Sequence, residues 1–196
     1  MAGGTVFSNG ADALIPRVAE DKDLVLGAQR GDIESFNRLI ERWEKRIFNY
    51  LLRILGDRED AMDVSQEVFL KAYQKIRSLQ EAERFSYWLF RIAHNEAFSL
   101  VRKSRPEEEW TGQGDGPEWS RRMAPVEVSL AVEAALGRLS PEQREAVVLK
   151  VYQGFKFEEI GEILGTPVST IKSRLYTGLE LLKQTLEPRL EKRPAE

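Results

Sequence analysis

The sequence predicts an all-α protein built from two small helical domains that a flexible linker over residues 104–130 joins. Apolar residues recur at steps of three and four along several runs, which is the pattern of one buried helix face. No run alternates apolar and polar residues in the way that a half-buried strand would. Residues 104–127 hold three prolines, three glycines and six acidic residues, a composition that cannot build a core.

Composition and charge narrow the class of protein. The chain has 196 residues, of which 42% are hydrophobic and 31% charged, and its net charge is -3. No run approaches the roughly 18 apolar residues of a membrane-spanning helix, and the first residues lack the parts of an export signal. The absence of cysteine rules out disulfides and thiolate sites, and the single histidine, His94, argues against a histidine metal cage. We therefore expect a cytoplasmic protein without membrane insertion, metal or other cofactor.

The first predicted domain covers residues 23–103 and follows a flexible leader over residues 1–22, which has no sustained period. Its first helix has Asp32 as N-cap and Gly56 as stop. The apolar faces of its three successive runs are Phe36, Leu39, Ile40, Trp43, Ile47, Leu51 and Leu55; Ala61, Val64, Val68, Ala72 and Ile76; and Trp88, Leu89, Ile92, Ala93, Ala97, Leu100 and Val101.

The second predicted domain covers residues 131–188 and precedes a tail over residues 189–196. Ser140, Pro141 and Gln143 supply an N-cap, a first-turn proline and a capping-box partner, which together indicate a helix start. The apolar surface of that helix consists of Ala146, Val147, Leu149 and Val151.

The stretch "FEEIGEILGTPVSTIKSRLY" predicts two short helices that cross steeply at a sharp turn. Gly165 permits the turn, and Thr166 and Pro167 restart the chain as N-cap and first helical residue. The residues at the crossing are Ile160, Gly161, Leu164 and Ile171. This is helix-turn-helix geometry, in which the second helix presents its first residues to the major groove of DNA.

The exposed residues of the second short helix are chemically suited to DNA, because Lys and Arg reach guanine or phosphate and Ser and Thr bind either more weakly. These candidates are Ser169, Thr170, Lys172, Ser173, Arg174 and Tyr176. An ordinary helical hairpin with a solvated polar face has the same spacing. Spacing alone leaves both interpretations open.

Two longer stretches carry a family resemblance. "LSPEQREAVVLKVYQGFKFEEIGEILGTPVSTIKSRLYTGLELLK" resembles region 4 of bacterial sigma factors, and "DREDAMDVSQEVFLKAYQKI" with "RFSYWLFRIAHNEAFSLVRK" resembles region 2. Two such domains in this order, without a third between them, resemble the extracytoplasmic-function (ECF) group. The resemblance implies a non-enzymatic subunit that binds core RNA polymerase and directs promoter-specific initiation.

The resemblance assigns polymerase docking to the helix over residues 57–76, which in the family binds the clamp coiled coil of the polymerase. The residues implied are Asp60, Asp63, Gln66, Glu67, Phe69 and Lys71. A helix-on-helix interface with a charged partner needs complementary side chains. Taken without the resemblance, this acidic stretch reads as a solvated helix start that matches the helix dipole.

The resemblance assigns melting and reading of the -10 element to the segment over residues 79–85 and the helix over residues 86–103. Capturing unstacked bases requires aromatic faces, amides and cations. The implied residues are Arg84, Tyr87, Arg91, Asn95, Arg102 and Lys103. Aromatic density favours a core position for Trp88, and His94 is expected to be partly buried and polar.

The -35 element would be read by the helix over residues 168–182, and the family also binds the polymerase flap through region 4. The continuation Thr177, Gly178, Leu179 and Glu180 departs from the arginine-rich family pattern, and Gly178 costs about 1 kcal/mol of helix stability relative to Ala.

Members of the group are commonly held inactive by an anti-sigma factor. The resemblance further implies that the acidic linker threads through the polymerase cleft, where Glu107, Glu108 and Glu109 would follow a basic path.

Two other classes compete with this interpretation. An autonomous helix-turn-helix regulator would bind operators as a dimer, but the net charge of -3 is unfavourable for binding DNA without help. An all-α enzyme would need a nucleophile with its base, a metal cluster or paired carboxylates. Glu158 and Glu159 are neighbours on a helix and point apart, so they do not form such a pair.

Overall fold

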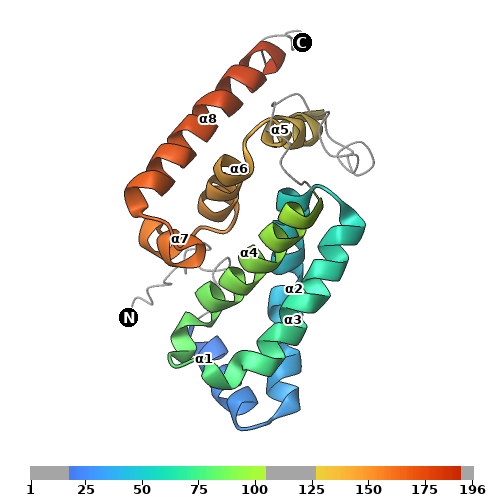
Figure 1. The fold of residues 1–196 in the computed structure, drawn as a ribbon, viewed down its shortest axis with the longest axis vertical. Helices are drawn as coiled ribbons and strands as arrows, with labels where there is room; N and C mark the ends of the chain where they lie inside the picture. Colours follow the sequence, from blue (N-terminus) through green and yellow to red (C-terminus); the bar gives the residue numbers. More distant parts are fainter. Residues whose placement is uncertain (1–17, 105–126, 191–196) are drawn as a thin grey trace, which may run out of the picture.

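A computed structural model describes residues 18–104 and 127–190, all of which lie in helices, helical turns and short connections (Figure 1). The elements are α1 (Val18–Gln29), α2 (Ile33–Leu55), α3 (Arg58–Lys75), the 3-10 turns η1 (Ile76–Ser78) and η2 (Ala82–Arg84), α4 (Phe85–Ser104), α5 (Glu127–Gly137), α6 (Pro141–Val147), the π-turn η4 (Val148–Tyr152), α7 (Phe157–Leu164) and α8 (Val168–Leu190). The predicted all-α fold class is confirmed.

The helix boundaries follow from local chemistry that the sequence displays. The Asp32 carboxylate accepts a hydrogen bond from the backbone N–H of Glu34 at 3.1 Å, and Gly56 ends α2 in the left-handed region with φ 76°. Ser140 and Gln143 form the predicted capping box at the start of α6, with both bonds at 3.2 Å. Gly165 ends α7 with φ 61°, as the sharp turn requires.

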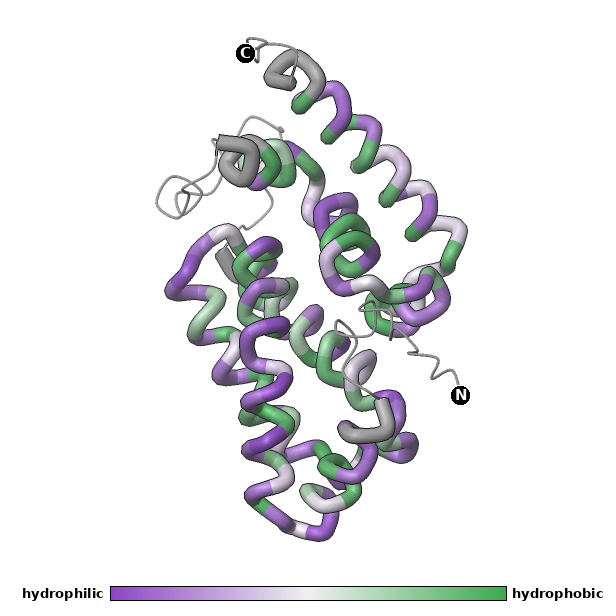
Figure 2. The backbone as a smooth tube through the Cα atoms, turned by 180° about the vertical axis from the view of Figure 1, so that it is seen from behind, coloured by the Kyte–Doolittle hydropathy of each residue, from purple (hydrophilic) through white to green (hydrophobic). Residues whose placement is uncertain are grey.

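Helices α1 to α4 pack around the apolar faces that the sequence predicts. Every predicted residue of the α3 face, from Ala61 to Ile76, is buried, as are five of the seven on α2. Figure 2 shows the consequence, because hydrophobic and hydrophilic residues alternate turn by turn along these helices. Helix α2 packs on α3, and α4 contacts both.

Helices α6, α7 and α8 form the second helical unit, with α5 packed on α8. Gly161 keeps the helix-turn-helix crossing close, because a Cβ there would lie 3.2 Å from the Thr166 carbonyl oxygen. Gly178 has a comparable packing reason. A Cβ at Gly178 would lie 3.2 Å from a methyl group of Val147, so a glycine allows α8 to approach α6 closely.

The structure departs from the predicted boundaries at the start of the chain. Helix α1 begins at Val18, inside the segment predicted as leader. Asp21 is buried there, and its carboxylate accepts hydrogen bonds from Arg42 at 2.6 Å and from the Trp43 indole at 3.2 Å. Val25 and Ala28, on the same face of α1 as Asp21, are buried as well, so tertiary contacts stabilise a helix that extends into the predicted leader.

Helix α5 begins at Glu127, a few residues before the predicted start of the second domain. Two predictions of detail need correction. Thr166 donates its hydroxyl to the Leu164 carbonyl at 3.2 Å rather than capping α8, and Pro167 supplies the carbonyl that accepts the first helical bonds. Val151 is 58% exposed, because the π-turn η4 turns it away from the buried face. The predictions for residues 1–17, 105–126 and 191–196 lie outside the described residues.

The two helical units share one hydrophobic core in the described structure. Phe155 of the second unit packs its ring 5.0 Å from that of Phe90 of α4. Buried Glu145 accepts a hydrogen bond from the Tyr50 hydroxyl and lies 2.8 Å from the Nδ1 atom of His94. His94 is thus partly buried and polar, as predicted.

Candidate nucleic-acid and polymerase interfaces

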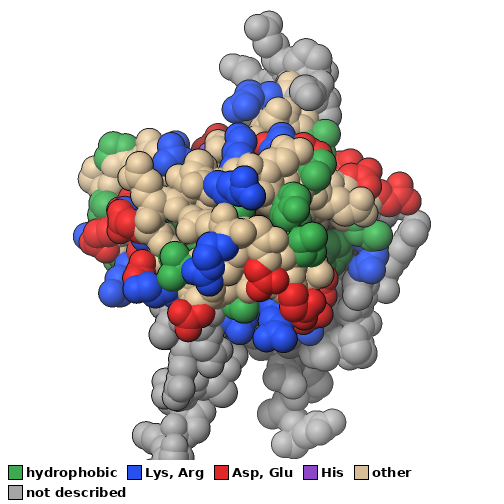
Figure 3. Space-filling view, turned by 90° about the horizontal axis from the view of Figure 1, so that it is seen from below, with side chains coloured by type: hydrophobic (Ala, Val, Ile, Leu, Met, Phe, Trp, Pro, Cys, Tyr) green, Lys and Arg blue, Asp and Glu red, His purple; other side chains and the backbone are tan. Residues whose placement is uncertain are grey.

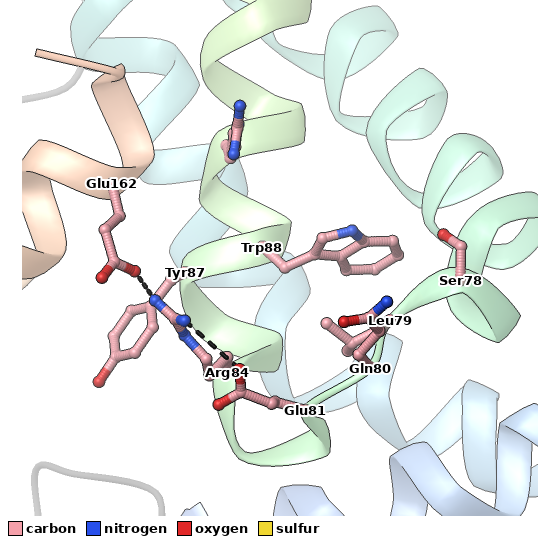
Figure 4. A pocket seen from close by; sticks show the side chains of 9 residues that line it. Ser78, Leu79, Gln80, Glu81, Arg84, Tyr87, Trp88 and Glu162 are labelled. Carbon is pink, nitrogen blue, oxygen red and sulfur yellow. Dashed lines mark ion pairs between the residues drawn. The ribbon is translucent and has the colours of Figure 1, made fainter.

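A hollow of about 340 Å³ lies between the loop that follows α3, the first half of α4 and helix α7 (Figure 4). Its lining consists of Ser78, Leu79, Gln80, Glu81, Arg84, Tyr87, Trp88, Arg91 and Glu162. This set, defined here as the α4 pocket, brings together three of the six predicted -10 residues, Arg84, Tyr87 and Arg91. It adds Gln80 and Trp88 from the same unit and Glu162 from α7.

The aromatic side chains of the α4 pocket are partly buried. Trp88 packs against Phe85 with ring centroids 5.9 Å apart, while its ring extends toward Leu79 and Gln80 (Figure 4). The predicted core position of Trp88 is therefore only half correct, because the ring also lines the hollow. Such a position fixes the ring and leaves part of its surface for a ligand.

Tyr87 stands at the edge of the α4 pocket that faces α7. Its hydroxyl donates to Glu159 Oε1 at 2.8 Å, and its ring packs 5.7 Å from that of Phe155. Burial, followed by the hydrogen bond to Glu159, raises the pKa of Tyr87 to about 12. The phenol is therefore held as a hydrogen-bond donor at physiological pH.

Arg84 is engaged by two carboxylates in the α4 pocket. Its guanidinium pairs with Glu81 of the same turn at 3.6 Å and with Glu162 of α7 (Figure 4). Arg91, one turn beyond Tyr87 on the same face of α4, is exposed and also lines the hollow. Helix α7 thus engages Arg84 through an ion pair, whereas Arg91 keeps an exposed side chain.

The remaining predicted -10 residues lie farther along the same face of α4, outside the α4 pocket. Asn95 and Arg102 are exposed, and their spacing from Arg91 places all three on one stripe of the helix. Lys103 belongs to α4, but its side chain lies outside the described residues.

A second hollow, of about 530 Å³, lies between α2 and α3 and is defined here as the α2–α3 groove. It is lined by Ile40, Glu44, Lys45, Phe48, Met62, Ser65, Gln66 and Phe69. Two predicted polymerase-binding residues, Gln66 and Phe69, lie in this groove. Met62 is 45% exposed there, and it gives the groove an apolar centre between charged side chains.

The other predicted polymerase-binding residues occupy a different stripe of α3. Asp60 and Asp63 are exposed, whereas Lys71 bonds to Glu96 of α4 at 2.5 Å and to Glu67 at 3.2 Å. The hydrogen bond to Glu96 raises the pKa of Lys71. The structure therefore divides the predicted set between the groove and the α3–α4 side.

The sequence interpretation missed the apolar part of the groove. Ile40, Phe48 and Met62 were not predicted as contact residues, although Met62 and Phe69 recur one heptad apart on α3. Met62 and Phe69 form a second apolar stripe beside the buried stripe that begins at Ala61. Apolar residues thus cover more of α3 than one buried face requires, and this excess could have indicated a contact surface.

The predicted -35 residues occupy the first turns of α8. Ser169, Thr170, Lys172, Ser173 and Tyr176 are exposed, and Arg174 is half-buried. The Lys172 ammonium lies 5.3 Å from the centre of the Phe157 ring, a cation–π contact that directs this side chain back toward α7. The stripe is thus accessible in the described structure.

Surface charge is mixed rather than gathered. Figure 3 shows one end of the molecule, where basic and acidic side chains are interspersed and neither sign forms a continuous patch. Within residues 18–104 and 127–190 no helix is long and apolar enough to cross a membrane. The molecule lacks, on this face, the broad basic surface of a protein that binds duplex DNA by charge alone.

Comparison with known proteins matches both halves of the chain. Residues 39–107 match the family model Sigma-70 region 2, and residues 129–182 match Sigma-70, region 4. The RNA polymerase sigma-H factor of Pseudomonas aeruginosa is 31% identical over 187 residues, which are 87% of this chain and 96% of that protein. The ECF RNA polymerase sigma factor SigW of Bacillus subtilis is 30% identical over 179 residues, 84% of this chain and 96% of that protein.

Solved structures agree in fold. CnrH in complex with the cytosolic domain of CnrY superposes with a TM-score of 0.67 at 24% identity, covering 86% of this chain and 98% of that one. The sigma factor RpoE in complex with the anti-sigma factor NepR, from Bartonella quintana, gives a TM-score of 0.64 at 24% identity. This superposition covers 79% of this chain and 98% of RpoE. With both regions matched in order and relatives covered almost completely, the chain belongs to the ECF sigma factors of the sigma-70 family, the non-catalytic subunits that direct transcription initiation by RNA polymerase.

Proposed function

We propose that this sigma factor reads the -10 element with the α4 pocket, reads the -35 element with the first turns of α8, and docks on core polymerase through the α2–α3 groove. The observation that carries the proposal is the composition of the α4 pocket. It combines two aromatic rings, two arginines and an amide around one hollow. Those are the groups that hold an unstacked base and its phosphates.

Each group in the α4 pocket has a chemical part in this proposal. Trp88 and Tyr87 offer faces on which a base can stack, which contributes about 1–3 kcal/mol per base. Arg91 and Arg84 supply charge for the adjoining phosphates. Gln80 is exposed at the rim, where its amide can donate to and accept from a base edge. Asn95 and Arg102 would follow the same strand farther along α4.

Helix α8 is proposed as the recognition helix for the -35 element. Its first turns leave the turn at Gly165 with Ser169, Thr170, Lys172 and Ser173 exposed, which suits insertion into the major groove. Arg174 directly follows Ser173 and is half-buried, so its side chain is positioned by packing. Lys172 and Arg174 are the side chains that we expect to distinguish base pairs.

Docking on polymerase is proposed to centre on the α2–α3 groove. Met62, Phe48 and Phe69 supply an apolar centre, and Gln66, Glu44 and Lys45 supply a polar rim. This arrangement matches the usual anatomy of a protein interface. The clamp coiled coil of the polymerase is the expected partner here, and the flap is the expected partner of region 4.

An anti-sigma factor is a further proposed partner. One solved relative in fold, RpoE, is bound to the anti-sigma factor NepR. We expect a protein of that class to bind this chain. Co-purification from the host tests the binding, and a rise in transcription when the partner is removed tests the inhibition.

The domain bounds are part of the proposal as well. They place region 2 at about residues 23–103 and region 4 at about residues 131–188.

Transcription with purified core polymerase, over a pool of upstream regions from the host, tests the proposed function. Discrete start sites that depend on this protein are expected, with Arg91→Ala weakening recognition of the -10 element and Arg174→Ala that of the -35 element. Arg138→Ala is the matched control, because Arg138 is exposed and lies outside all three surfaces. Tight duplex binding by the protein alone, without polymerase binding, would instead support an autonomous regulator.

A further inference from the structure

We propose that helix α7 is an interaction surface for the α4 pocket of the same chain, and that its carboxylates Glu159 and Glu162 occupy the place of DNA until polymerase separates the two regions. The inference rests on the proposed function of the α4 pocket. It concerns the unbound sigma factor, whose DNA-reading groups are covered by its own region 4.

Two polar contacts from one helix carry the inference. Glu159 accepts the hydrogen bond of the Tyr87 hydroxyl at 2.8 Å, and Glu162 pairs with the Arg84 guanidinium. The two carboxylates are three residues apart, so they project from the same face of α7. Figure 4 shows Glu162 reaching from α7 to Arg84 at the margin of the α4 pocket.

The chemistry of these contacts is the chemistry proposed for DNA. A carboxylate presents negative oxygens to an arginine as a phosphate does, and it accepts from a phenol as a base edge does. A nucleic-acid strand that enters the α4 pocket must therefore displace Glu162 from Arg84 and Glu159 from Tyr87. Net charge of -3 for the chain fits a protein that neutralises its own cations in this way.

Other contacts hold α7 in this position. Phe155, which precedes α7, packs against the rings of Phe90 and Tyr87 at 5.0 and 5.7 Å. Arg46 of α2 donates to the side chain and to the backbone carbonyl of Gln153 at 3.3 and 3.2 Å. The arrangement is thus a packed interface between the two regions and not a single ion pair.

The proposed polymerase-docking surface lies elsewhere. The α2–α3 groove is lined by residues of α2 and α3, and its Met62 remains exposed. Polymerase can therefore dock on the closed protein. It can open the protein only by binding the open form more tightly than the closed form.

A distance measurement on the full-length chain tests closure directly. Because the chain has no cysteine, Gln74→Cys and Thr177→Cys place one spin label on α3 and one on α8, both at exposed positions. A single, narrowly distributed distance that agrees with the structure is expected for the free protein, and a different one after core polymerase is added. A distance that is unchanged by polymerase, or that disagrees with the structure in the free protein, would overturn the inference.

A charge reversal tests the part played by the carboxylates. Glu162→Lys is expected to raise the affinity of the free protein for a labelled single-stranded -10 oligonucleotide by about fivefold or more, since it replaces an ion pair by a repulsion. Glu158→Lys makes the same charge change at an exposed position of α7 and is the control. Equal affinities for the two variants would contradict the inference.

The two proposals fail separately. If Arg91→Ala leaves -10 recognition by holoenzyme unchanged, the α4 pocket does not read DNA and the proposed function fails. The spin-label distance would still report whether region 4 closes on region 2. A closed free protein whose Glu162→Lys variant gains no DNA affinity would leave the proposed function intact and overturn only the role of the carboxylates.

A different contact carries a second inference, which concerns α1. We infer that Gln29 is a positioning residue for the loop of the α4 pocket. Its amide nitrogen donates to the carbonyl oxygens of Ile76 at 3.0 Å and of Leu79 at 2.7 Å, so both N–H groups are used on the turn that leads into the loop. Lys22 of α1 pairs with Glu83 at 2.5 Å beyond the loop.

The identity of residue 29 determines this contact. A glutamate there would direct carboxylate oxygens at two carbonyl oxygens, whereas the glutamine directs two donors at them. Gln29→Glu in the holoenzyme is expected to reduce by about threefold the discrimination between promoters that differ in one -10 base, a loss near that of one hydrogen bond. Polymerase affinity should stay unchanged, because Gln29 lies outside the α2–α3 groove.

The readout separates positioning from mere stability. Gln74→Glu makes the same chemical change at an exposed site of α3 and serves as control. A purely structural role would lower the folded fraction and all transcript yields together, with the ratio between promoters unchanged. An unchanged ratio in Gln29→Glu would overturn the inference.

Discussion

The α2–α3 groove and the α4 pocket differ in what covers them. The groove presents an exposed apolar centre at Met62, whereas in the pocket Arg84 and Tyr87 are held by carboxylates of α7. The groove is lined by α2 and α3 of region 2, whereas the pocket is lined by the turns after α3 and by α4, with Glu162 of α7 added from region 4. The free protein therefore offers the surface proposed for polymerase and covers part of the surface proposed for DNA.

This difference gives a physical reason for an order of binding. On the proposal above, DNA that enters the α4 pocket displaces two carboxylates of α7, whereas the α2–α3 groove has Met62 exposed and is open to polymerase. The proposed arrangement would give the sigma factor access to promoters only as part of holoenzyme. It would also account for a net charge of -3 in a chain whose family directs initiation on DNA.

The largest expected effect concerns the open surface. Met62→Asp places a charge in the apolar centre of the α2–α3 groove and is expected to weaken binding to core polymerase by about 30-fold, which corresponds to about 2 kcal/mol. Titration of labelled variant with core polymerase measures it. Ile33→Asp is the control, because Ile33 is 61% exposed and lies outside the groove. Equal affinities would move docking to the Asp60 and Asp63 stripe.

The next effect concerns the interface that closes the protein. Glu145→Ala removes the buried acceptor that the Tyr50 hydroxyl and His94 share. Leaving a buried hydroxyl without its acceptor should cost about 1–3 kcal/mol in the free energy of unfolding. Denaturant unfolding of the full chain measures this loss. Tyr50→Phe should lower the free energy of unfolding by less, because it removes the hydroxyl and leaves no buried donor without an acceptor. A loss confined to a separate transition of region 4 would show that the two regions unfold independently.

Local pattern was sufficient for most of the fold. The buried face from Ala61 to Ile76 could be predicted because each residue follows a helical period that only one face satisfies. The caps at Asp32 and Ser140 could be predicted because their partners lie two or three residues away. Val151 was predicted to belong to the apolar surface of its helix, but it is exposed. The π-turn η4 changes the number of residues per turn there, and no residue type in the sequence indicates such a change.

The site could be predicted only in part, for a different reason. Tyr87 and Arg91 follow one face of α4, and Arg84 ends the 3-10 turn that leads into this helix, so their spacing in the sequence already places them close together. The ion pair between Arg84 and Glu162 joins residues that are 78 positions apart, and the sequence around either residue does not indicate it. Buried Asp21 is missed similarly, since its partners Arg42 and Trp43 lie on another helix.

A smaller effect concerns α8, the proposed recognition helix, whose first turns are exposed in the described structure, unlike Arg84 and Tyr87 of the α4 pocket. Lys172→Ala is expected to weaken promoter binding by holoenzyme by about fivefold, or about 1 kcal/mol, without changing the spin-label distance of the free chain. Footprinting across the -35 element at several salt concentrations measures the loss. The control is Lys156→Ala, which removes an exposed lysine that precedes α7. A change in distance would mean that Lys172 also supports closure.

The smallest effect is the titration of Tyr87, which reports closure without any partner. Burial and the hydrogen bond to Glu159 raise the pKa of Tyr87 from 10.0 to about 12. The folded, closed form therefore holds this proton more tightly than the unfolded chain does. The stability that this contact contributes is complete below pH 10.0 and is lost as the pH rises through about 12.

Tyrosinate absorbance of the wild type minus that of Tyr87→Phe isolates this phenol. In Glu159→Gln the difference curve should move toward lower pH, because the acceptor of the hydrogen bond has lost its charge, whereas Glu158→Gln should leave the curve in place. A Tyr87 phenol that titrates near pH 10.0 in the wild type would mean that α7 is not seated on α4 in solution, and the contrast between an open groove and a covered pocket would not hold.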